Sequence, residues 1–246
     1  MSLIPTSALA MAPNMTANFQ YLAESVGEIF GEKPELKLLV ERDEPLFHEA
    51  GVFFPDDNAL FVTSNFIDNS GSKSIKISRV TLPSDDAAAE DAQVDLVETP
   101  NVTLANGGVN YRDGIVFCAQ GDMERPSGLA YMKVKPVEGR YDSEMILDKF
   151  YSRNFNSPND VVAHNDGSLW FTDPIYGSEQ GIRPEPTLPP QVWRFDPATK
   201  SVRAMADGFG RPNGLAFSPD QKTLYVTDTD RVHGDGSEDQ TRASHM

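Results

Sequence analysis

Short apolar stretches separated by polar turns recur along the chain. Three segments, 49–63, 159–173 and 213–228, share one pattern: a polar lead residue, an apolar strand, a turn rich in Asp, Asn, Gly or Pro, and a second apolar strand. A fainter copy occupies residues 106–118. Apolar runs on both sides of such a turn are typical of a β-hairpin. Each copy therefore predicts one hairpin.

The hairpins repeat at a regular interval. Their second strands begin 55, 54 and 55 residues apart, at Leu60, Ile115, Leu169 and Leu224. Further strand-like runs lie between them, such as 74–80 and 191–196. Several short strands in a period of this length indicate a propeller blade of four strands. Only 18–30 suggests a helix, and no amphipathic helical segment separates the strand pairs, which disfavours an α/β sheet. We predict an all-β fold, a β-propeller with about four blades of sequence.

Two segments interrupt the repeat. Residues 84–91 are acidic and rich in Ala, and we expect a solvated loop there. Residues 182–190 include four prolines, which predicts an extended, stiff loop on one face of the propeller.

The charge of the chain narrows the function classes. Its 246 residues include 37 Asp and Glu against 21 Lys and Arg, a net charge of −16. Such a charge repels phosphate backbones and anionic lipids, so nucleic-acid partners and membrane binding are disfavoured. No apolar run approaches the roughly 18 residues that cross a bilayer.

The single cysteine and the N-terminus give further expectations. Cys118 can form no intramolecular disulfide, and its apolar surroundings predict a buried strand residue rather than a nucleophile. The first residues contain a short apolar stretch that no Lys or Arg precedes. We therefore expect a cytoplasmic protein, with secretion as the alternative.

The lead residues of the strong hairpins carry the candidate chemistry. Equivalent positions of successive blades surround one axis, so Glu49, Asn159 and Asn213 are expected to converge. One carboxylate and two amide oxygens suit calcium, which accepts roughly six to eight oxygen ligands. No cluster of His or Cys indicates zinc. The alternative is that these residues only cap turns. Their shared phase favours the metal site, because a turn cap would not select a carboxylate at Glu49.

Three segments resemble a known family. Residues 157–177 and 211–229 are similar to successive blades of the gluconolactonase branch of the SMP-30/gluconolactonase-like family. Residues 48–53 resemble its first-blade Glu motif in the form typical of fungal lactonohydrolases. The resemblance extends from about Leu39 to Asp239.

The resemblance implies a six-bladed propeller that hydrolyses lactones. Its axial divalent cation, usually calcium, is held by a Glu, two Asn and an Asp, and the Asp also serves as general base. Glu49 matches the Glu ligand, Asn159 the first Asn and Asn213 the second. The Asp is expected about 54 residues after Asn213, near position 267 and beyond Met246.

The length of the repeat also predicts the domain organisation. Six blades of this period require roughly 320 residues. We therefore expect residues 39–246 to form an incomplete propeller, and residues 1–38 to form an N-terminal leader.

The other titratable residues are weaker candidates for catalytic roles. His48 and Asp160 are the weak candidates for the missing base. His48 precedes the Glu ligand, so an extended strand would point its side chain to the opposite face. Asp160 follows the first Asn ligand and is expected to stabilise the turn. Asp173 and Asp228 are expected to accept hydrogen bonds at strand ends, and His233 could line a substrate entrance.

The sequence thus predicts metal-dependent hydrolysis of a small-molecule lactone. One alternative is organophosphate hydrolysis, because phosphotriesterase-like propellers share the ligand set. Another is a non-catalytic propeller fragment that lacks the fourth ligand. Sugar-lactone members of the family commonly carry an Arg where this chain has Ser157, so a preference for simple sugar lactones is not implied. A serine lactonase is unsupported, because the chain has no GxSxG elbow.

Overall fold

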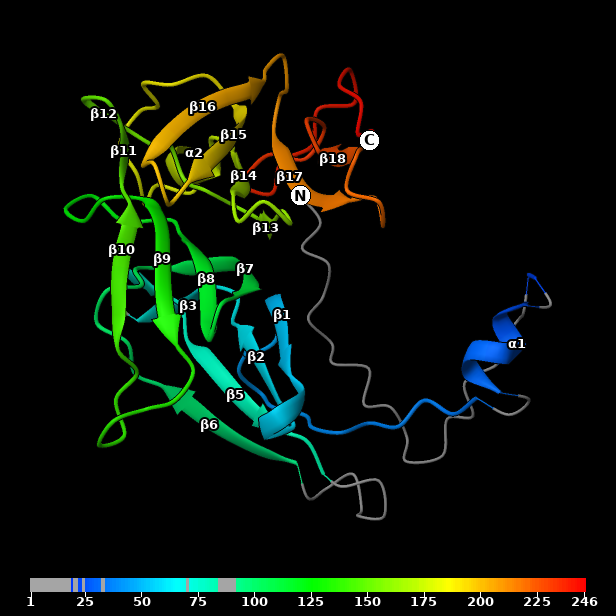
Figure 1. The fold of residues 1–246 in the computed structure, drawn as a ribbon. Helices are drawn as coiled ribbons and strands as arrows, with labels where there is room; N and C mark the ends of the chain where they lie inside the picture. The colour runs from blue at the N-terminus through cyan, green and yellow to red at the C-terminus, as the bar shows by residue number, and fades with distance from the viewer. Residues whose placement is uncertain (1–18, 20–21, 24, 32–33, 70, 84–91) are drawn as a thin grey trace.

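Antiparallel sheets follow one another along the chain (Figure 1). The computed structural model describes residues 19, 22–23, 25–31, 34–69, 71–83 and 92–246. Within these residues, three sheets of four strands are followed by a two-stranded hairpin. The all-β fold is confirmed, and its sheets have the arrangement of propeller blades.

Each sheet uses consecutive stretches of chain. The first has the order β1-β2-β5-β6, formed by Glu49–Phe54, Ala59–Thr63, Ile77–Thr81 and Gln93–Val97. The second has the order β7-β8-β9-β10, formed by Ala105–Tyr111, Gly114–Ala119, Gly128–Lys133 and Ser143–Leu147. The third has the order β13-β14-β15-β16, formed by Val161–Ala163, Leu169–Asp173, Gln191–Asp196 and Ser201–Ala206. The last hairpin pairs β17 with β18, Pro212–Phe217 and Leu224–Asp228.

Smaller elements connect these sheets. Two short hairpins are formed by β3 with β4 and by β11 with β12, which span Ile67–Asn69, Ser72–Ser74, Lys149–Phe150 and Arg153–Asn154. The described helices are α1 and α2, with a 3₁₀ turn between β1 and β2; they span Ser25–Phe30, Tyr176–Glu179 and Pro55–Asp57.

The first strand of each sheet lies innermost. β7 contacts both β1 and β13, and β13 also contacts β17. The lead residues at the start of these strands are thereby brought to one central region, as the repeat predicts.

The predicted hairpins form because each turn contains a left-handed residue. Asn58, Arg112, Gly167 and Gln221 all have φ between 44° and 84°. One left-handed residue is what the common short hairpin turns require. The antiparallel pairs Phe54–Ala59 and Phe217–Leu224 close the first and last hairpins.

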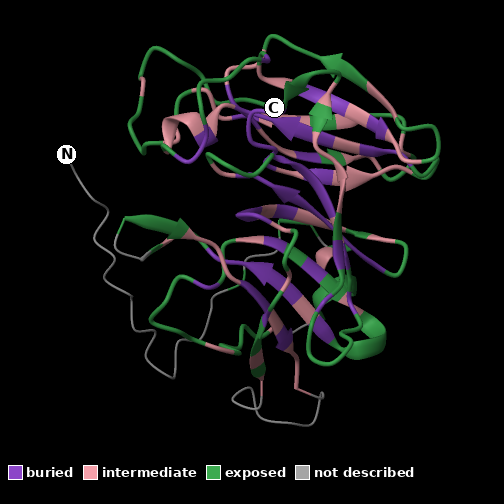
Figure 2. Cartoon of the chain, turned by 90° about the vertical axis from the view of Figure 1, so that its left-hand side faces the viewer, coloured by how far each residue is buried: buried purple, intermediate pink, exposed green. Residues whose placement is uncertain are grey.

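Strand β8 shows how the sheets pack against each other. Every residue of β8 is buried, and its side chains alternate between two neighbours. Ile115 and Phe117 belong to the core shared with the first sheet, whereas Val116 and Cys118 belong to the core shared with the third. Figure 2 shows buried strand centres in successive sheets. The prediction that Cys118 is a buried strand residue is confirmed, since it is 0% exposed.

Some predicted elements differ from the observed ones. The strand-like run 74–80 is divided between β4 and β5. Within the predicted helix 18–30, the described helix is α1, which buries no residue and lies apart from the sheets (Figure 1). α2 was not predicted, because four residues are too few to show a helical period.

The proline-rich loop is more deeply anchored than predicted. Leu188 is buried in the core shared by the second and third sheets, which also contains Trp193, and Ile182 is buried as well. The Arg183 guanidinium is buried and donates hydrogen bonds to the carbonyls of Asn156, Phe155, Asp122 and Arg125. The loop therefore joins the second and third sheets.

Several predictions fall on residues outside the described set. They concern the acidic loop 84–91 and residues 1–18 of the expected N-terminal leader. Among the described helices, none combines the length and the apolar character that a membrane span requires.

Replacing Phe117 with Ala should destabilise the propeller strongly. The ring is fully buried and packs against Gly108, where a Cβ would lie 2.9 Å from the ring. Removing such a ring costs about 3–5 kcal/mol. Urea unfolding of the variant measures the loss. Tyr151→Ala, at a ring that is 86% exposed, is the control and should change stability little; equal losses would contradict the packing described.

Candidate active site

The polar lead residues line one cavity at the inner ends of the sheets. Its volume is about 370 Å³, and its walls include Glu49, Asn106, Asn159 and Asn213. Glu49, Asn106 and Asn213 belong to β1, β7 and β17, and Asn159 lies two residues before β13. The structure therefore brings together the three residues that the repeat predicted as ligands and adds Asn106.

A backbone irregularity lies beside three of the four lead residues. The strand register shifts between Glu49 and Val52 in β1, and Ala50 there has φ of 53°. β7 and β17 have the same kind of shift, between Ala105 and Gly108 and between Pro212 and Leu215. A β-bulge redirects side chains and is common beside active sites. It points these side chains at the cavity rather than into the cores between sheets.

The carbonyls of the three lead Asn residues accept hydrogen bonds from neighbouring sheets. Thr63 Oγ1 donates to the carbonyl of Asn106 at 3.0 Å, and Thr172 Oγ1 donates to that of Asn213 at 2.6 Å. The carbonyl of Asn159 instead accepts from the backbone N–H of Gly107 at 2.8 Å. A Cβ at Gly107 would lie 2.6 Å from that carbonyl oxygen, so only Gly permits this contact.

Buried carboxylates hold the segments that lead into two of these residues. Asp173 accepts hydrogen bonds from the backbone N–H groups of Asn156 and Ser157, both at 2.9 Å. Asp228 accepts from Gly210 and Arg211 in the same way, at 2.9 and 2.7 Å. The predicted strand-end role of both Asp residues is confirmed.

Asp160 has a structural role of the predicted kind. Its Oδ1 accepts from the N–H of Val161, and its Oδ2 accepts from that of Leu215 in β17 at 3.1 Å. Burial raises the pKa of this carboxyl, and the charge of Glu49 adds to the rise. With both oxygens engaged by backbone, Asp160 joins the third sheet to the last hairpin.

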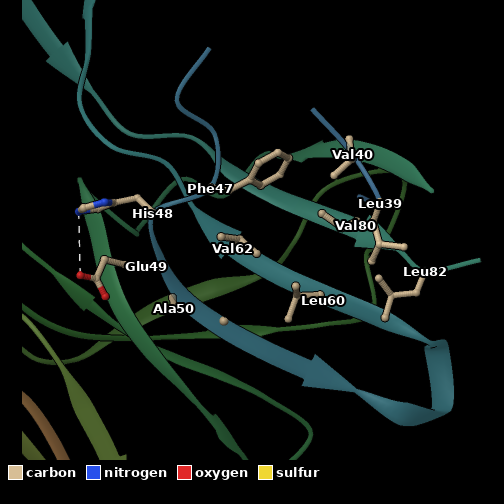
Figure 3. A pocket seen from close by; sticks show the side chains of 11 residues that line it. Leu39, Val40, Phe47, His48, Glu49, Ala50, Leu60, Val62, Val80 and Leu82 are labelled. Atoms are coloured by element: carbon tan, nitrogen blue, oxygen red, sulfur yellow. Dashed lines mark ion pairs between the residues drawn. The ribbon is translucent and has the colours of Figure 1, made fainter. Parts of the chain in front are cut away.

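The predicted direction of His48 is wrong. Its Nε2 lies 3.9 Å from Oε1 of Glu49, and both side chains line the same cavity. His48 precedes β1, so the alternation of an extended strand does not apply to it. The pair also lies at one end of an apolar pocket on the first sheet, and Figure 3 shows both side chains pointing away from Leu60 and Val80 in its walls. His233 also lines the polar cavity.

Asn106 is the site residue to which the repeat assigned no role. It occupies the lead position of the faint fourth copy, and its Oδ1 is buried with no hydrogen-bond partner among the described residues. The Asn-Gly pair at 106–107 was the available signal. Tyr176, in α2, also lines the cavity, and no repeat marks it.

The donor set fits a hard cation. One carboxylate and four amide groups line the cavity, those of the three lead Asn residues and of Gln180, and carbonyl and carboxylate oxygens are what calcium prefers. The buried, unpartnered Oδ1 of Asn106 is an acceptor that a cation would satisfy. Among the described residues, no group of three or more His, Cys, Asp or Glu side chains has a metal-binding arrangement.

Fold and site together define an antiparallel β-propeller with an oxygen-rich cavity on its axis. Residues 77–233 match the sequence model of the SMP-30/Gluconolactonase/LRE-like region, and the chain belongs to this family.

Named relatives agree with this assignment. The chain is 29% identical over 213 residues to lactonohydrolase oryL of Aspergillus oryzae, an alignment that covers 82% of this chain and 44% of that protein. It is 38% identical over 107 residues to a gluconolactonase of Zymomonas mobilis, covering 42% of this chain and 29% of the relative. The structure of a gluconolactonase from Xanthomonas campestris superposes with a TM-score of 0.57 at 26% identity, covering 76% of this chain and 56% of that one. The chain thus spans about half the length of the relatives, or less.

Asp173 should make the stability of the fold depend on pH. Complete burial raises its pKa from 3.8 to about 7, against the opposing backbone hydrogen bonds. The folded state then holds a proton that the unfolded state has lost, so this contribution is full below pH 3.8 and disappears as pH rises through about 7. The free energy of unfolding should therefore differ less between pH 5 and pH 8 in Asp173→Asn than in wild type.

Chemical denaturation at the two pH values measures this difference. Asp220→Asn is the control, because a hydrogen bond from Ser218 lowers the pKa of that exposed carboxyl and keeps it ionised throughout the range. An unchanged pH slope in Asp173→Asn would show that Asp173 does not take up the proton.

Proposed function

We propose that the protein hydrolyses a lactone ring to its hydroxy acid in the axial cavity, with a divalent cation, most simply calcium, as cofactor. The observation that carries the proposal is the convergence of Glu49, Asn106, Asn159 and Asn213 on one cavity. Membership of the SMP-30/Gluconolactonase/LRE-like family, and relatives named lactonohydrolase and gluconolactonase, support the choice of substrate.

The four lead residues would hold the cation. Glu49 contributes the negative charge, and the amide oxygens of the three Asn residues complete the protein ligands. A divalent cation there supplies Lewis-acid polarisation of a bound carbonyl.

Side chains of the protein would accept the proton of the attacking water. His48 and His233 line the cavity, and imidazole is the side chain that most often accepts a proton from an attacking water. His48 is the better placed of the two, because it lies beside Glu49. Asp160 is the poorer base, since both its oxygens already accept backbone hydrogen bonds.

The surroundings of Ser157 bear on which lactone is accepted. Ser157 is 2% exposed, and its Oγ donates to the carbonyl of Pro174 and accepts from the N–H of Gly177. A Cβ at Gly177 would lie 2.8 Å from that of Ser157, so α2 closes over this position. A long cationic side chain has no room there. We therefore propose a lactone other than a simple sugar lactone as the preferred substrate.

Removing one ligand should abolish cation-dependent hydrolysis. We expect calcium to support lactone opening, EDTA to stop it, and Asn159→Ala to lower kcat/KM by about 100-fold or more, beyond the range of changes to outer-shell groups. Ring opening can be followed by acid release at constant pH. Asn110→Ala is the matched control, because the side chain of that exposed Asn donates to the carbonyl of Phe53 outside the cavity.

The substrate panel distinguishes the other functions. It should include aldonolactones, aliphatic lactones and a phosphotriester. Hydrolysis of the phosphotriester alone would identify an organophosphate hydrolase. Calcium binding without any turnover would indicate a non-catalytic binding module, and activity that resists both EDTA and Asn159→Ala would overturn the proposed site.

A further inference from the structure

Helix α2 lies across the segment that leads into β17. Two of its residues, one helical turn apart, make contacts there: Tyr176 contacts Asn213 in β17, and Glu179 contacts Arg211 just before it. Residues three apart share one face of a helix. A short, unpredicted helix is therefore attached at two points beside one of the proposed cation ligands.

A chain of hydrogen bonds runs from the amide of Asn213 to a backbone carbonyl. Nδ2 of Asn213 donates to the hydroxyl of Tyr176 at 3.4 Å. The Tyr176 hydroxyl shares a short hydrogen bond with Oγ1 of Thr229. Thr229 Oγ1 in turn donates to the carbonyl of Arg211 at 3.4 Å.

The carbonyl of Arg211, at the end of this series of hydrogen bonds, determines which group donates in each bond. The carbonyl oxygen of Arg211 can only accept, so Thr229 uses its one hydroxyl proton there. Tyr176 must then donate to Thr229, and its oxygen accepts from the side chain of Asn213. Because only the amide NH₂ can donate, Oδ1 of Asn213 is left for the cavity.

We propose that Tyr176 and Thr229 are positioning residues that fix the amide of Asn213 so that its oxygen, not its nitrogen, faces the cation site. The inference rests on the proposed function, because it assigns a role in holding the proposed cation. An amide that turned over would place an NH₂ group against the cation, replacing an attractive ligand with a repulsive one. Partners that orient a ligand typically raise metal affinity by about 10–100-fold.

An ion-pair cluster keeps α2 in place for this task. The Arg211 side chain is 9% exposed and lies between Glu179 and Asp230. Glu179 also accepts the backbone N–H of Gly234 at 2.7 Å. Burial alone would raise the pKa of Glu179, but the hydrogen bonds from Arg211 and Gly234 hold it below its usual range. A charged, paired Glu179 anchors the helix to β17 and to the loop that carries Gly234.

Calcium titration of the chain by calorimetry tests the inference without any substrate. Tyr176→Phe removes the hydroxyl and keeps the ring, so calcium should bind about 10–100-fold more weakly. Thr229→Val should have a similar effect, whereas Thr229→Ser keeps the hydroxyl and should bind as wild type does. The double variant Tyr176→Phe/Thr229→Val should bind about as weakly as either single one, because the two residues act in one chain of hydrogen bonds.

Tyr111→Phe is the matched control. It removes a phenol hydroxyl that bonds the carbonyl of Gly167, away from the cavity, and should leave calcium affinity unchanged. Thermal unfolding of the calcium-free variants shows whether each is folded. If Tyr176→Phe does not fold, the Thr229 pair still decides the question.

The outcomes separate this inference from the proposed function. Weaker binding in Tyr176→Phe and Thr229→Val, with rescue by Thr229→Ser, supports both. Normal calcium binding in folded Tyr176→Phe and Thr229→Val overturns the positioning role and leaves the proposed function intact. A wild-type chain that binds no divalent cation overturns the cation site, and the positioning role with it.

Discussion

Burial of apolar side chains between neighbouring sheets is the constraint on which the rest of the structure depends. A sheet such as the second one has apolar side chains on both sides, with Phe117 facing one neighbour and Val116 facing the other. Burying one large apolar side chain contributes about 1.5–3 kcal/mol, so neither face can remain exposed at low cost. The second sheet accordingly lies between the first and the third. Because every blade repeats the same strand order, this stacking brings the first strands together at one axis.

The stacking of the sheets creates the polar site, and it also requires that the backbone groups at the site be hydrogen-bonded. Where the first strands meet, their backbone groups are removed from water and must be paired within the protein. Thr63 and Thr172 meet this need by reaching across to the lead carbonyls of the next sheet. Asp173 does so at the expense of its own solvation, since its buried carboxyl has a pKa raised to about 7. These contacts fix the backbone, so the lead side chains are free to face the cavity.

The sequence repeat predicted the fold and most of the site because both follow from one period. Glu49, Asn159 and Asn213 occupy the same position in successive repeats. In a propeller, equivalent positions of the blades lie around one axis, so these residues line one cavity. His48 was misplaced for a local reason, since strand alternation was applied to a residue that precedes the strand. Tyr176 belongs to a helix of only four residues, which leaves no periodic trace. Its contact with Asn213 joins residues 37 positions apart, and only the folded chain shows it.

Amides at three of the four lead positions keep the negative charge of the cavity low. A divalent cation held by Glu49 and neutral oxygens would retain positive charge, which favours polarisation of a neutral carbonyl. The chain as a whole carries a net charge of −16. Lactone hydrolysis would convert a neutral substrate into an anion, so the surrounding charge would leave substrate entry unaffected and disfavour retention of the product. The positive charge of the site would act on ring opening and would also attract the carboxylate that forms, whereas the net charge of the chain would repel it, so product release would depend on the balance of the two.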